Sequence, residues 1–301
     1  MMLKREIATA HRPLIMYQNQ PTGLVKGLVY IAHGMGEHAA RYEPVMARFA
    51  EAGFLAVAND HRGHGPSANL GDFGREGWAG IVADTRTILD HLVEDHPNLP
   101  LILMGHSMGA MLVQQFFHNL PDQVAGILLS GSPGKMPNIL SAIFQKIIAF
   151  ERWRTSGGSS PVVDYLIFGS SNRGFKTAKN ATGFEWLSRD QAVVNAYFAD
   201  PLCGFVPNTA SLSGLFQAEA EHWDLAPDAK LKAMPIYLVS GADDPVHSDQ
   251  QNLSRLIDWL TTAGATLDID IYPNGRHEML NETNRDQVVN QIITWMNKVI
   301  S

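Results

Sequence analysis

Most of this chain alternates between short hydrophobic runs and longer stretches in which hydrophobic residues recur every three or four positions. The short runs predict buried strands at residues 27–32, 54–58, 100–104, 124–130 and 236–239. The helical spacing predicts helices at residues 42–52, 79–96, 110–118, 253–260 and 288–299. Strands that are apolar throughout are typical of a parallel sheet that helices cover on both faces. We therefore predict an α/β fold with a mostly parallel central sheet.

The alternation of strand and helix signals stops between residues 135 and 226. An apolar residue recurs every three or four positions from Met136 to Ile148, which predicts an amphipathic helix. A second helix is predicted from Ser188, where Ser-Arg-Asp-Gln has the form of a capping box. We interpret residues 135–226 as a helical cap inserted over one edge of a core formed by residues 1–134 and 227–301. The apolar cap residues either line a cavity or pack the cap onto the core.

Composition narrows the class of protein. Of 301 residues, 45% are hydrophobic and 18% are charged, as in a globular chain rather than a disordered one. The formal charge of −7 and the absence of a basic stretch exclude a nucleic-acid-binding surface. The single cysteine, Cys203, cannot form an internal disulfide. Without a signal-peptide pattern or an apolar run long enough to span a membrane, the expected location is the cytoplasm. No pattern indicates an oligomeric state.

Residues 105–109 read Gly-His-Ser-Met-Gly, between a predicted strand and a predicted helix. A G-x-S-x-G sequence in this position is typical of a nucleophile elbow, a sharp turn that exposes the central serine at the edge of a sheet. The glycines are expected where neighbouring backbones approach too closely for a Cβ atom. Ser107 is therefore the candidate nucleophile. The alternative is a turn in which Ser107 only caps the following helix.

A serine nucleophile needs a base, and the base needs a partner that orients it. The active site of such a sheet lies beyond the carboxyl ends of its strands. His277 follows the last predicted strand, at residues 267–271, and is the candidate base. Asp243 and Asp244 follow the strand before it, and because adjacent residues point in opposite directions, only one of them can reach His277. The chain order Ser, Asp, His suits this arrangement.

The reaction also requires an oxyanion hole made of backbone N–H groups. One donor is expected from the residue after the nucleophile, Met108. The second is expected from the loop His33-Gly-Met-Gly, which follows an early strand, and Met35 is its candidate donor.

Two loops carry four histidines that could lie close together, His33, His38, His61 and His64. Their spacing does not indicate a tetrahedral site, so we expect no metal and no cofactor. A simpler interpretation is that the loop at Asp60–Gly65 supports the oxyanion loop through Arg62 and its histidines.

Four motifs of this chain together resemble the motif set of the α/β-hydrolase fold. They are His-Gly-Met-Gly-Glu-His at residues 33–38, Asp-His-Arg-Gly-His-Gly at 60–65, Gly-His-Ser-Met-Gly at 105–109 and Gly-Ala-Asp-Asp-Pro at 241–245. The subgroup they resemble is that of monoacylglycerol lipases and lysophospholipases. In the cap, Phe-Glu-Trp-Leu-Ser at 184–188 and Tyr-Phe-Ala-Asp-Pro at 197–201 are similar to bacterial lysophospholipases.

The resemblance implies roles for individual residues. It places the nucleophile on Ser107, the base on His277 and the oxyanion donors on Met35 and Met108. In the family the acid is the third residue after the glycine that ends its strand, which selects Asp244 over Asp243.

The resulting hypothesis is a serine hydrolase that cleaves esters of single-chain lipids, monoacylglycerols or lysophospholipids, through an acyl-enzyme intermediate. The cap would admit an acyl chain or touch a membrane surface without spanning it. Two alternatives remain: the same triad acting on small esters, amides or C–C bonds, and a binding protein with an idle triad.

Overall fold

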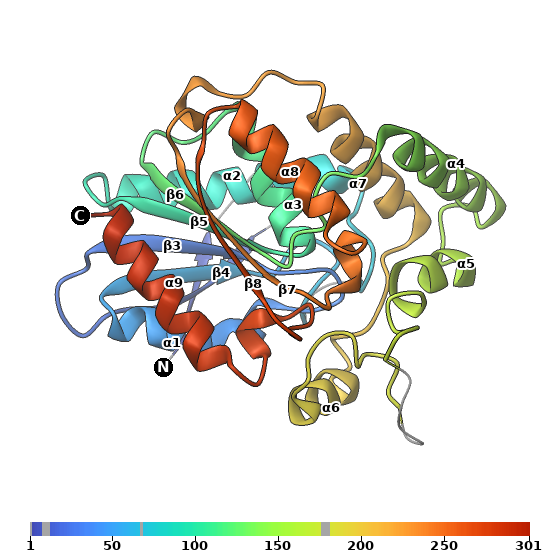
Figure 1. Cartoon of the computed structure of the whole chain (residues 1–301), viewed down its shortest axis with the longest axis horizontal. Helices are drawn as coiled ribbons and strands as arrows, with labels where there is room; N and C mark the ends of the chain where they lie inside the picture. The colour runs from blue at the N-terminus through green and yellow to red at the C-terminus, as the bar shows by residue number, and fades with distance from the viewer. Residues whose placement is uncertain (1, 8–12, 67–68, 176–180) are drawn as a thin grey trace.

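The computed structural model describes residues 2–7, 13–66, 69–175 and 181–301, and these form a central sheet with helices on both faces (Figure 1). The strands are β1 (Leu3–Ile7), β2 (Leu14–Asn19), β3 (Gly27–Ala32), β4 (Phe54–Asn59), β5 (Leu101–His106), β6 (Val124–Ser130), β7 (Pro235–Gly241) and β8 (Thr266–Tyr272). Their order in the sheet is β1-β2-β4-β3-β5-β6-β7-β8.

Strands β3 to β8 run parallel, whereas β2 pairs antiparallel with both β1 and β4. The predicted α/β-hydrolase fold is confirmed. β3, β4 and β5 are buried along their whole length, which explains why they have no polar face. β1 and β2 were not predicted, and they extend the sheet at the edge beyond β4.

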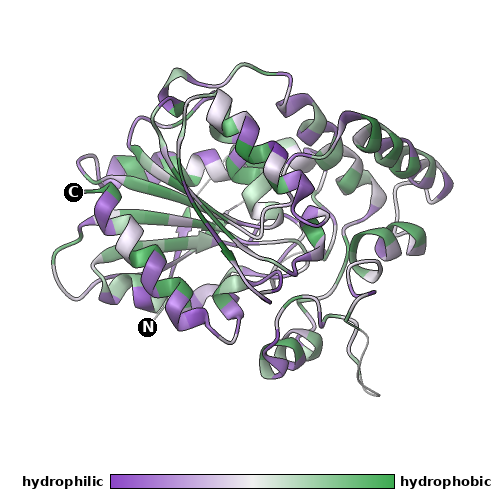
Figure 2. Ribbon diagram, in the orientation of Figure 1, coloured by the Kyte–Doolittle hydropathy of each residue, from purple (hydrophilic) through white to green (hydrophobic). Residues whose placement is uncertain are grey.

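Two hydrophobic cores cover the two faces of the sheet. Side chains of α2 (Gly77–Asp95), α3 (Met108–Gln114) and α8 (Gln251–Thr262) pack on one face. Side chains of α1 (Glu43–Glu51) and α9 (Arg285–Val299) pack on the other. Colouring by hydropathy shows the central strands, such as β3, β5 and β6, as largely hydrophobic (Figure 2). Packing of helices on both faces of the sheet fixes the positions of the strand ends, from which the candidate functional loops emerge.

The described part of residues 135–226 contains helices and no strand. The helices are α4 (Asn138–Arg154), α5 (Pro161–Asp164), the π-helical turn Tyr165–Gly169, α6 (Gln191–Ala199) and α7 (Thr209–His222). α4, α5 and α6 lie at one side of the molecule, on the right of Figure 1. The helix predicted from Met136 to Ile148 is α4, but only Ile148 and Glu151 of α4 are buried.

The predicted capping box at Ser188 is wrong. Helix α6 begins at Gln191 and is capped by Asp190, whose carboxylate accepts a hydrogen bond from the Ala192 N–H. The Ser188 hydroxyl instead donates to the Asn281 carbonyl at 3.0 Å, in a loop far along the chain. Ser188 therefore bonds to a loop that is distant in sequence, and it does not cap α6.

Candidate active site

The turn at Ser107 has the geometry of a nucleophile elbow. Ser107 has φ 54° and ψ −117°, a left-handed conformation that is strained for a residue with a side chain. A Cβ atom on Gly105 would lie 2.2 Å from the Gly109 carbonyl oxygen, and one on Gly109 would lie 2.0 Å from the Ala32 carbonyl oxygen. Both glycines are therefore required by close backbone contacts. The strain at Ser107 is held by the surrounding strand β5 and helix α3.

His277 and Asp244 form a buried pair. The Asp244 Oδ2 atom lies 2.8 Å from His277 Nδ1, and both residues are 2% exposed. The other carboxylate oxygen accepts a hydrogen bond from the Val246 N–H at 2.9 Å, which orients the carboxylate. Asp243, the competing acid, is exposed. The structure thus brings together Asp244 and His277 from the loops after β7 and β8.

The electrostatics of this pair favour a charged aspartate beside a basic imidazole. Burial disfavours both charges, but the two groups stabilise each other's charged form at hydrogen-bond distance. As a result the pKa of Asp244 is lowered and the pKa of His277 is raised above the usual 6.5 of histidine. With Nδ1–H donated to Asp244, the Nε2 atom is left to act as a base.

Ser107 and His277 share a small cavity. It has a volume of about 20 Å³, and Gly34, Met35 and Trp186 also line it. The Trp186 ring lies beside His277 with the ring centres 5.0 Å apart. A volume of this size is enough for one water molecule. Ser107 and His277 therefore line the same small cavity.

His33 orients the peptide that carries the Met35 N–H. The His33 Nε2 atom accepts a hydrogen bond from the His61 N–H at 3.1 Å, so the proton of the neutral ring is on Nδ1. That Nδ1–H donates to the Gly34 carbonyl oxygen at 2.8 Å. Because the peptide is trans, the Met35 N–H points away from this carbonyl. Burial lowers the pKa of His33, which keeps the ring neutral.

A second histidine holds the other end of the candidate oxyanion loop, residues 33–36, through a backbone hydrogen bond. The His64 Nε2 atom accepts a hydrogen bond from the Gly36 N–H at 3.3 Å, while its Nδ1–H donates to the Arg62 carbonyl at 2.9 Å. Burial lowers the pKa of His64 to about 3, so this ring is neutral as well. Met108, the second expected donor, is the first residue of α3, where an N–H has no partner within the helix. Met35, Ser107 and Met108 line one cavity.

A buried ion-pair chain, not predicted from the sequence, joins the oxyanion loop to the loop of His277. Glu37 accepts a hydrogen bond from the Gly34 N–H at 2.6 Å and pairs with Arg41. Arg41 also donates to both carboxylate oxygens of Glu278, at 2.8 and 2.7 Å. Burial alone would raise the pKa of Glu37, but the Arg41 charge, the neighbouring histidines and the Gly34 N–H together outweigh it and bring the pKa to about 2. The four-residue spacing of Glu37 and Arg41 was the available sequence signal.

The expected bracing role of Arg62 is only partly correct. The Arg62 side chain bonds to Asp84 at 2.8 and 3.0 Å and pairs with Glu76, so it ties its loop to α2. Only its carbonyl contacts His64, which in turn holds the oxyanion loop. The histidines, rather than the guanidinium, therefore contact that loop.

A larger cavity of about 290 Å³ extends from Ser107 under the inserted helices. Its volume is near the lower limit for pockets that bind small molecules. The lining is mainly apolar and includes Met35, Met108, Met111, Met136, Phe144, Ile167, Phe168, Trp186 and Phe216. Several of these residues come from the segment 135–226, so this segment lines a cavity in addition to packing on the core.

Part of the same segment is bonded to the loop of His277. The Trp186 and Leu187 carbonyls accept hydrogen bonds from the His277 and Glu278 N–H groups, at 3.3 and 2.8 Å. The Arg276 guanidinium donates to the Ser188 carbonyl at 2.9 Å. The loop that presents His277 is therefore held by the inserted segment as well as by the sheet.

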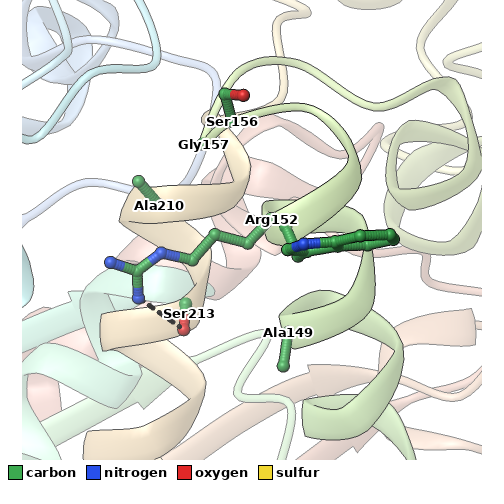
Figure 3. Close-up of a pocket in the computed structure, with 7 residues that line it drawn as sticks. Ala149, Arg152, Ser156, Gly157, Ala210 and Ser213 are labelled. Carbon is green, nitrogen blue, oxygen red and sulfur yellow. Dashed lines mark hydrogen bonds between the residues drawn. The ribbon is translucent and has the colours of Figure 1, made fainter.

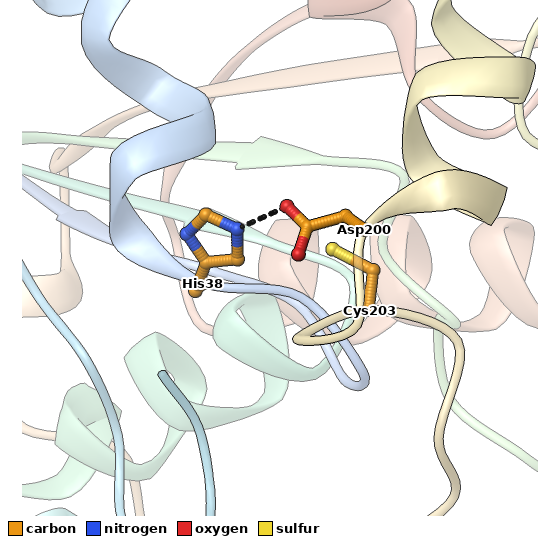
Figure 4. Close-up of side chains that lie close together, drawn as sticks. All are labelled: His38, Asp200 and Cys203. Atoms are coloured by element: carbon orange, nitrogen blue, oxygen red, sulfur yellow. Dashed lines mark hydrogen bonds and ion pairs between the residues drawn. The ribbon is translucent and has the colours of Figure 1, made fainter. Parts of the chain in front are cut away.

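Two other features lie outside this site. An open surface pocket of about 500 Å³ lies where Arg152 of α4 donates to Ser213 of α7 at 3.3 Å (Figure 3), and it contains none of the candidate residues. His38, Asp200 and Cys203 lie together with ligand-capable atoms within 4.8 Å (Figure 4). His38 Nε2 already bonds to Asp200 at 2.9 Å, and burial raises the pKa of the Cys203 thiol to about 12. The hydrogen bond between His38 and Asp200 joins the loop after β3 to the end of α6.

Comparisons with known proteins identify the family. The profile described as "Serine aminopeptidase, S33" matches residues 23–284. A monoacylglycerol lipase of Mycolicibacterium smegmatis is 30% identical over 278 residues, which cover 90% of this chain and 88% of that protein. The human monoglyceride lipase is 36% identical over 137 residues, 43% of this chain and 42% of that protein.

A solved structure supports the same conclusion. The carboxyl esterase of Bacillus coagulans, solved in complex with glycerol, has a TM-score of 0.88 and 27% identity, and covers 100% of this chain and 99% of that one. Among the described residues, no helix is long and apolar enough to cross a membrane. The chain belongs to the serine aminopeptidase S33 family of α/β-hydrolases, in its monoacylglycerol lipase-like subgroup.

Proposed function

We propose that this chain is a carboxylic ester hydrolase that cleaves monoacylglycerols or lysophospholipids through an acyl-enzyme intermediate on Ser107. The observation that carries the proposal is the buried His277–Asp244 pair, which faces the same small cavity as a strained serine. The monoacylglycerol lipase relative and the esterase structure support the ester as the bond that is cleaved.

In the acylation half of the reaction, the Ser107 Oγ atom attacks the ester carbonyl carbon and passes its proton to His277 Nε2. Asp244 stabilises the imidazolium and keeps its Nδ1–H oriented. The carbonyl oxygen takes up the negative charge and accepts hydrogen bonds from the Met35 and Met108 N–H groups. When the C–O bond to the alcohol breaks, the imidazolium returns the proton to the leaving oxygen.

In the deacylation half, a water molecule replaces the alcohol. His277 takes one proton from this water as its oxygen attacks the acyl carbon, and the same two N–H groups hold the oxyanion. The bond between the acyl carbon and Ser107 Oγ then breaks, and the imidazolium gives its proton to Oγ. The products are a fatty acid and the regenerated serine.

The shape and lining of the larger cavity support a single-chain lipid as the substrate. Ser107 lines the cavity together with apolar side chains of α3 and the inserted helices, and an acyl chain needs such an apolar lining beside the nucleophile. We propose that residues 135–226 are the cap of a core made of residues 1–134 and 227–301, and that the cap supplies one wall of the acyl site.

The outer surface of the cap supports contact with a lipid surface. Along α4 and the following turn, large apolar side chains are exposed, including Ile139 at 77% and Trp153 at 76%. The hydropathy colouring shows this helix as hydrophobic at the edge of the molecule (Figure 2). An exposed apolar helix face with basic residues such as Lys146 and Arg152 is typical of a helix that lies on a membrane surface.

A hydrolysis panel tests the function. Purified protein is incubated with a monoacylglycerol, a lysophosphatidylcholine, a short-chain ester and an aminoacyl amide, and kcat/KM is measured for each. We expect the highest value for a single-chain lipid, with loss of both turnover and fluorophosphonate labelling in Ser107→Ala. Turnover of the short ester or the amide alone would refute the lipid proposal, and labelling of Ser107→Ala would refute the serine mechanism.

A further inference from the structure

One carboxyl group in the apolar cavity has no role in the proposed reaction. Glu219 lies on α7 and lines the cavity that contains Ser107. Its Oε1 atom accepts a hydrogen bond from the Trp223 indole N–H at 3.0 Å. Its Oε2 atom is buried and has no hydrogen-bond partner among the described residues. Glu219 therefore lines the cavity, and one oxygen of its carboxyl group has no hydrogen-bond partner among the described residues.

Such an atom opposes folding. A buried polar atom without a partner loses its interaction with water and gains nothing in return. Among the described residues, no charged side chain contributes to the electrostatics of Glu219, so no ion pair offsets this cost. Burial raises the pKa of Glu219 to about 8, so its carboxyl group is mostly protonated at neutral pH. A leucine would be the less costly side chain for a purely apolar cavity.

We propose that Glu219 is a polar subsite within the acyl cavity, which favours acyl chains that carry a hydroxyl group. The inference rests on the proposed function, since it takes this cavity as the acyl site. Phe216, one turn earlier on α7, lines the same cavity, as do Met136 and Phe144. The lining also contains the polar residues Ser141, Ser170, Ser171, Ser248 and Asn252. The apolar side chains fit the hydrocarbon on either side of the hydroxyl group.

A hydroxyl group suits this carboxyl group in both of its protonation states. It can accept a hydrogen bond from the protonated acid and donate one to the carboxylate. A keto or ether oxygen only accepts, and a plain methylene chain does neither. The terminal torsion of glutamate has a broad potential, so rotation of the carboxyl group can present either oxygen to a ligand. The bound hydroxyl group would replace the missing partner of Oε2.

Positional isomers of hydroxydodecanoyl glycerol, compared with dodecanoyl glycerol, test the proposal. In the wild-type protein we expect one isomer to have a kcat/KM roughly tenfold above that of the plain chain, the effect of one buried hydrogen bond. In Glu219→Leu the ratio should fall to about one or lower. Glu219→Gln should keep most of the preference, because its amide also donates and accepts.

A matched control and a binding measurement complete the test. Glu221, an exposed glutamate on the same helix, is replaced by leucine, and this variant should keep the wild-type ratio. The Ser107→Ala protein, with and without Glu219→Leu, is titrated with hydroxydodecanoic and dodecanoic acids against a fluorescent fatty acid. The hydroxylated acid should bind more tightly only when Glu219 is present.

The outcomes separate this inference from the proposed function. Equal preference in the wild type and in Glu219→Leu, or no preferred isomer at all, would overturn the polar subsite even if plain monoacylglycerols are cleaved. If no lipid ester is cleaved, the proposed function fails, and the binding measurement still decides whether Glu219 recognises a hydroxylated chain.

Discussion

Arg41 donates two hydrogen bonds to the Glu278 carboxylate, at 2.8 and 2.7 Å, across 237 positions of sequence. Glu278 is the neighbour of His277, and Arg41 also pairs with Glu37, which holds the Gly34 N–H. One buried guanidinium thus connects the loop that carries the candidate base to the loop that carries a candidate oxyanion donor. The relative position of these two loops depends on this contact.

Removal of Arg41 should destabilise the protein. In Arg41→Met, Glu37 and Glu278 lose their shared buried cation, and breaking such a pair costs roughly 3–5 kcal/mol. The free energy of unfolding, measured by urea titration, should fall by this amount. Arg48→Met is the control, because Arg48 pairs with the exposed Asp286 and should cost less than about 1 kcal/mol. An equal loss in the two variants would contradict the coupling.

Asp244→Asn should reduce kcat by roughly 10⁴ while leaving the fold intact. An asparagine amide at this position can donate to His277 Nδ1, which places the ring proton on Nε2 and removes the base. Asp243→Asn should have little effect, because Asp243 is exposed. Steady-state kinetics on a monoacylglycerol, with circular dichroism as a check on folding, makes the comparison. A larger loss in the Asp243 variant would reverse the assignment.

The pH profile of kcat/KM should show an acidic limb with a midpoint above 6.5. The neutral imidazole of His277 is the base, and Asp244 raises the pKa of this histidine despite its burial. Activity therefore falls as the pH decreases through the raised pKa and His277 becomes protonated. An uncharged ester is the suitable substrate, since only groups of the enzyme then titrate. A midpoint below 6.5 would argue against the described pair as the functional base.

Gly109→Ala should abolish the elbow, because the new Cβ atom would lie 2.0 Å from the Ala32 carbonyl oxygen. The backbones of β3 and α3 must then separate, which displaces Ser107 and the oxyanion loop together. We expect loss of fluorophosphonate labelling and a fall in the melting temperature by thermal unfolding. The control is Gly23→Ala, where no atom beyond the adjoining residues of the chain lies within 4 Å of the added carbon. A labelled and stable Gly109→Ala protein would disprove this account of the elbow.

Polar substitutions on α4 should weaken binding to lipid vesicles. The double variant Ile139→Ser and Trp153→Ser removes two highly exposed apolar side chains. Burial of each of these side chains in the lipid would contribute roughly 1.5–3 kcal/mol to the free energy of binding. Sedimentation with phosphatidylcholine vesicles should show at least about tenfold weaker association, with unchanged hydrolysis of a short soluble ester. Leu24→Ser removes an 89% exposed leucine outside α4 and should bind like the wild type. Unchanged vesicle binding of the double variant would reject the membrane-contact surface.

The sequence predicted the parts of the fold that local patterns encode. The apolar run at Gly27–Ala32 is a strand buried along its length because a parallel strand has no solvent-facing side. Gly105 and Gly109 were expected from the elbow motif, and their close backbone contacts explain why the motif is restrictive. The antiparallel strand β2 was missed, although Leu14 and Met16 are buried on either side of the half-buried Ile15.

Patterns failed where a side chain has partners in distant segments. The sequence at Ser188 matched a capping box. In the structure, the Ser188 hydroxyl donates a hydrogen bond to the Asn281 carbonyl, and Asp190 caps α6 instead. The spacing of α4 showed that one face is apolar without showing what covers it, and the fold leaves Ile139 exposed. A periodic pattern describes one element, whereas burial depends on its neighbours.

By itself, the sequence determined which strands are buried, where the chain must turn sharply, and which serine and histidine follow the strand ends. These properties depend on residues close together in the chain. Local patterns left Asp243 and Asp244 open and the family resemblance selected Asp244, whose carboxylate the tertiary structure places 2.8 Å from His277 Nδ1. Only the tertiary structure decided that Arg41 joins two loops. It also placed Glu219 in an apolar cavity without a partner for Oε2. Ion pairing and desolvation depend on distances in space. These distances are set by the packing of the whole chain, so a local sequence pattern does not contain them.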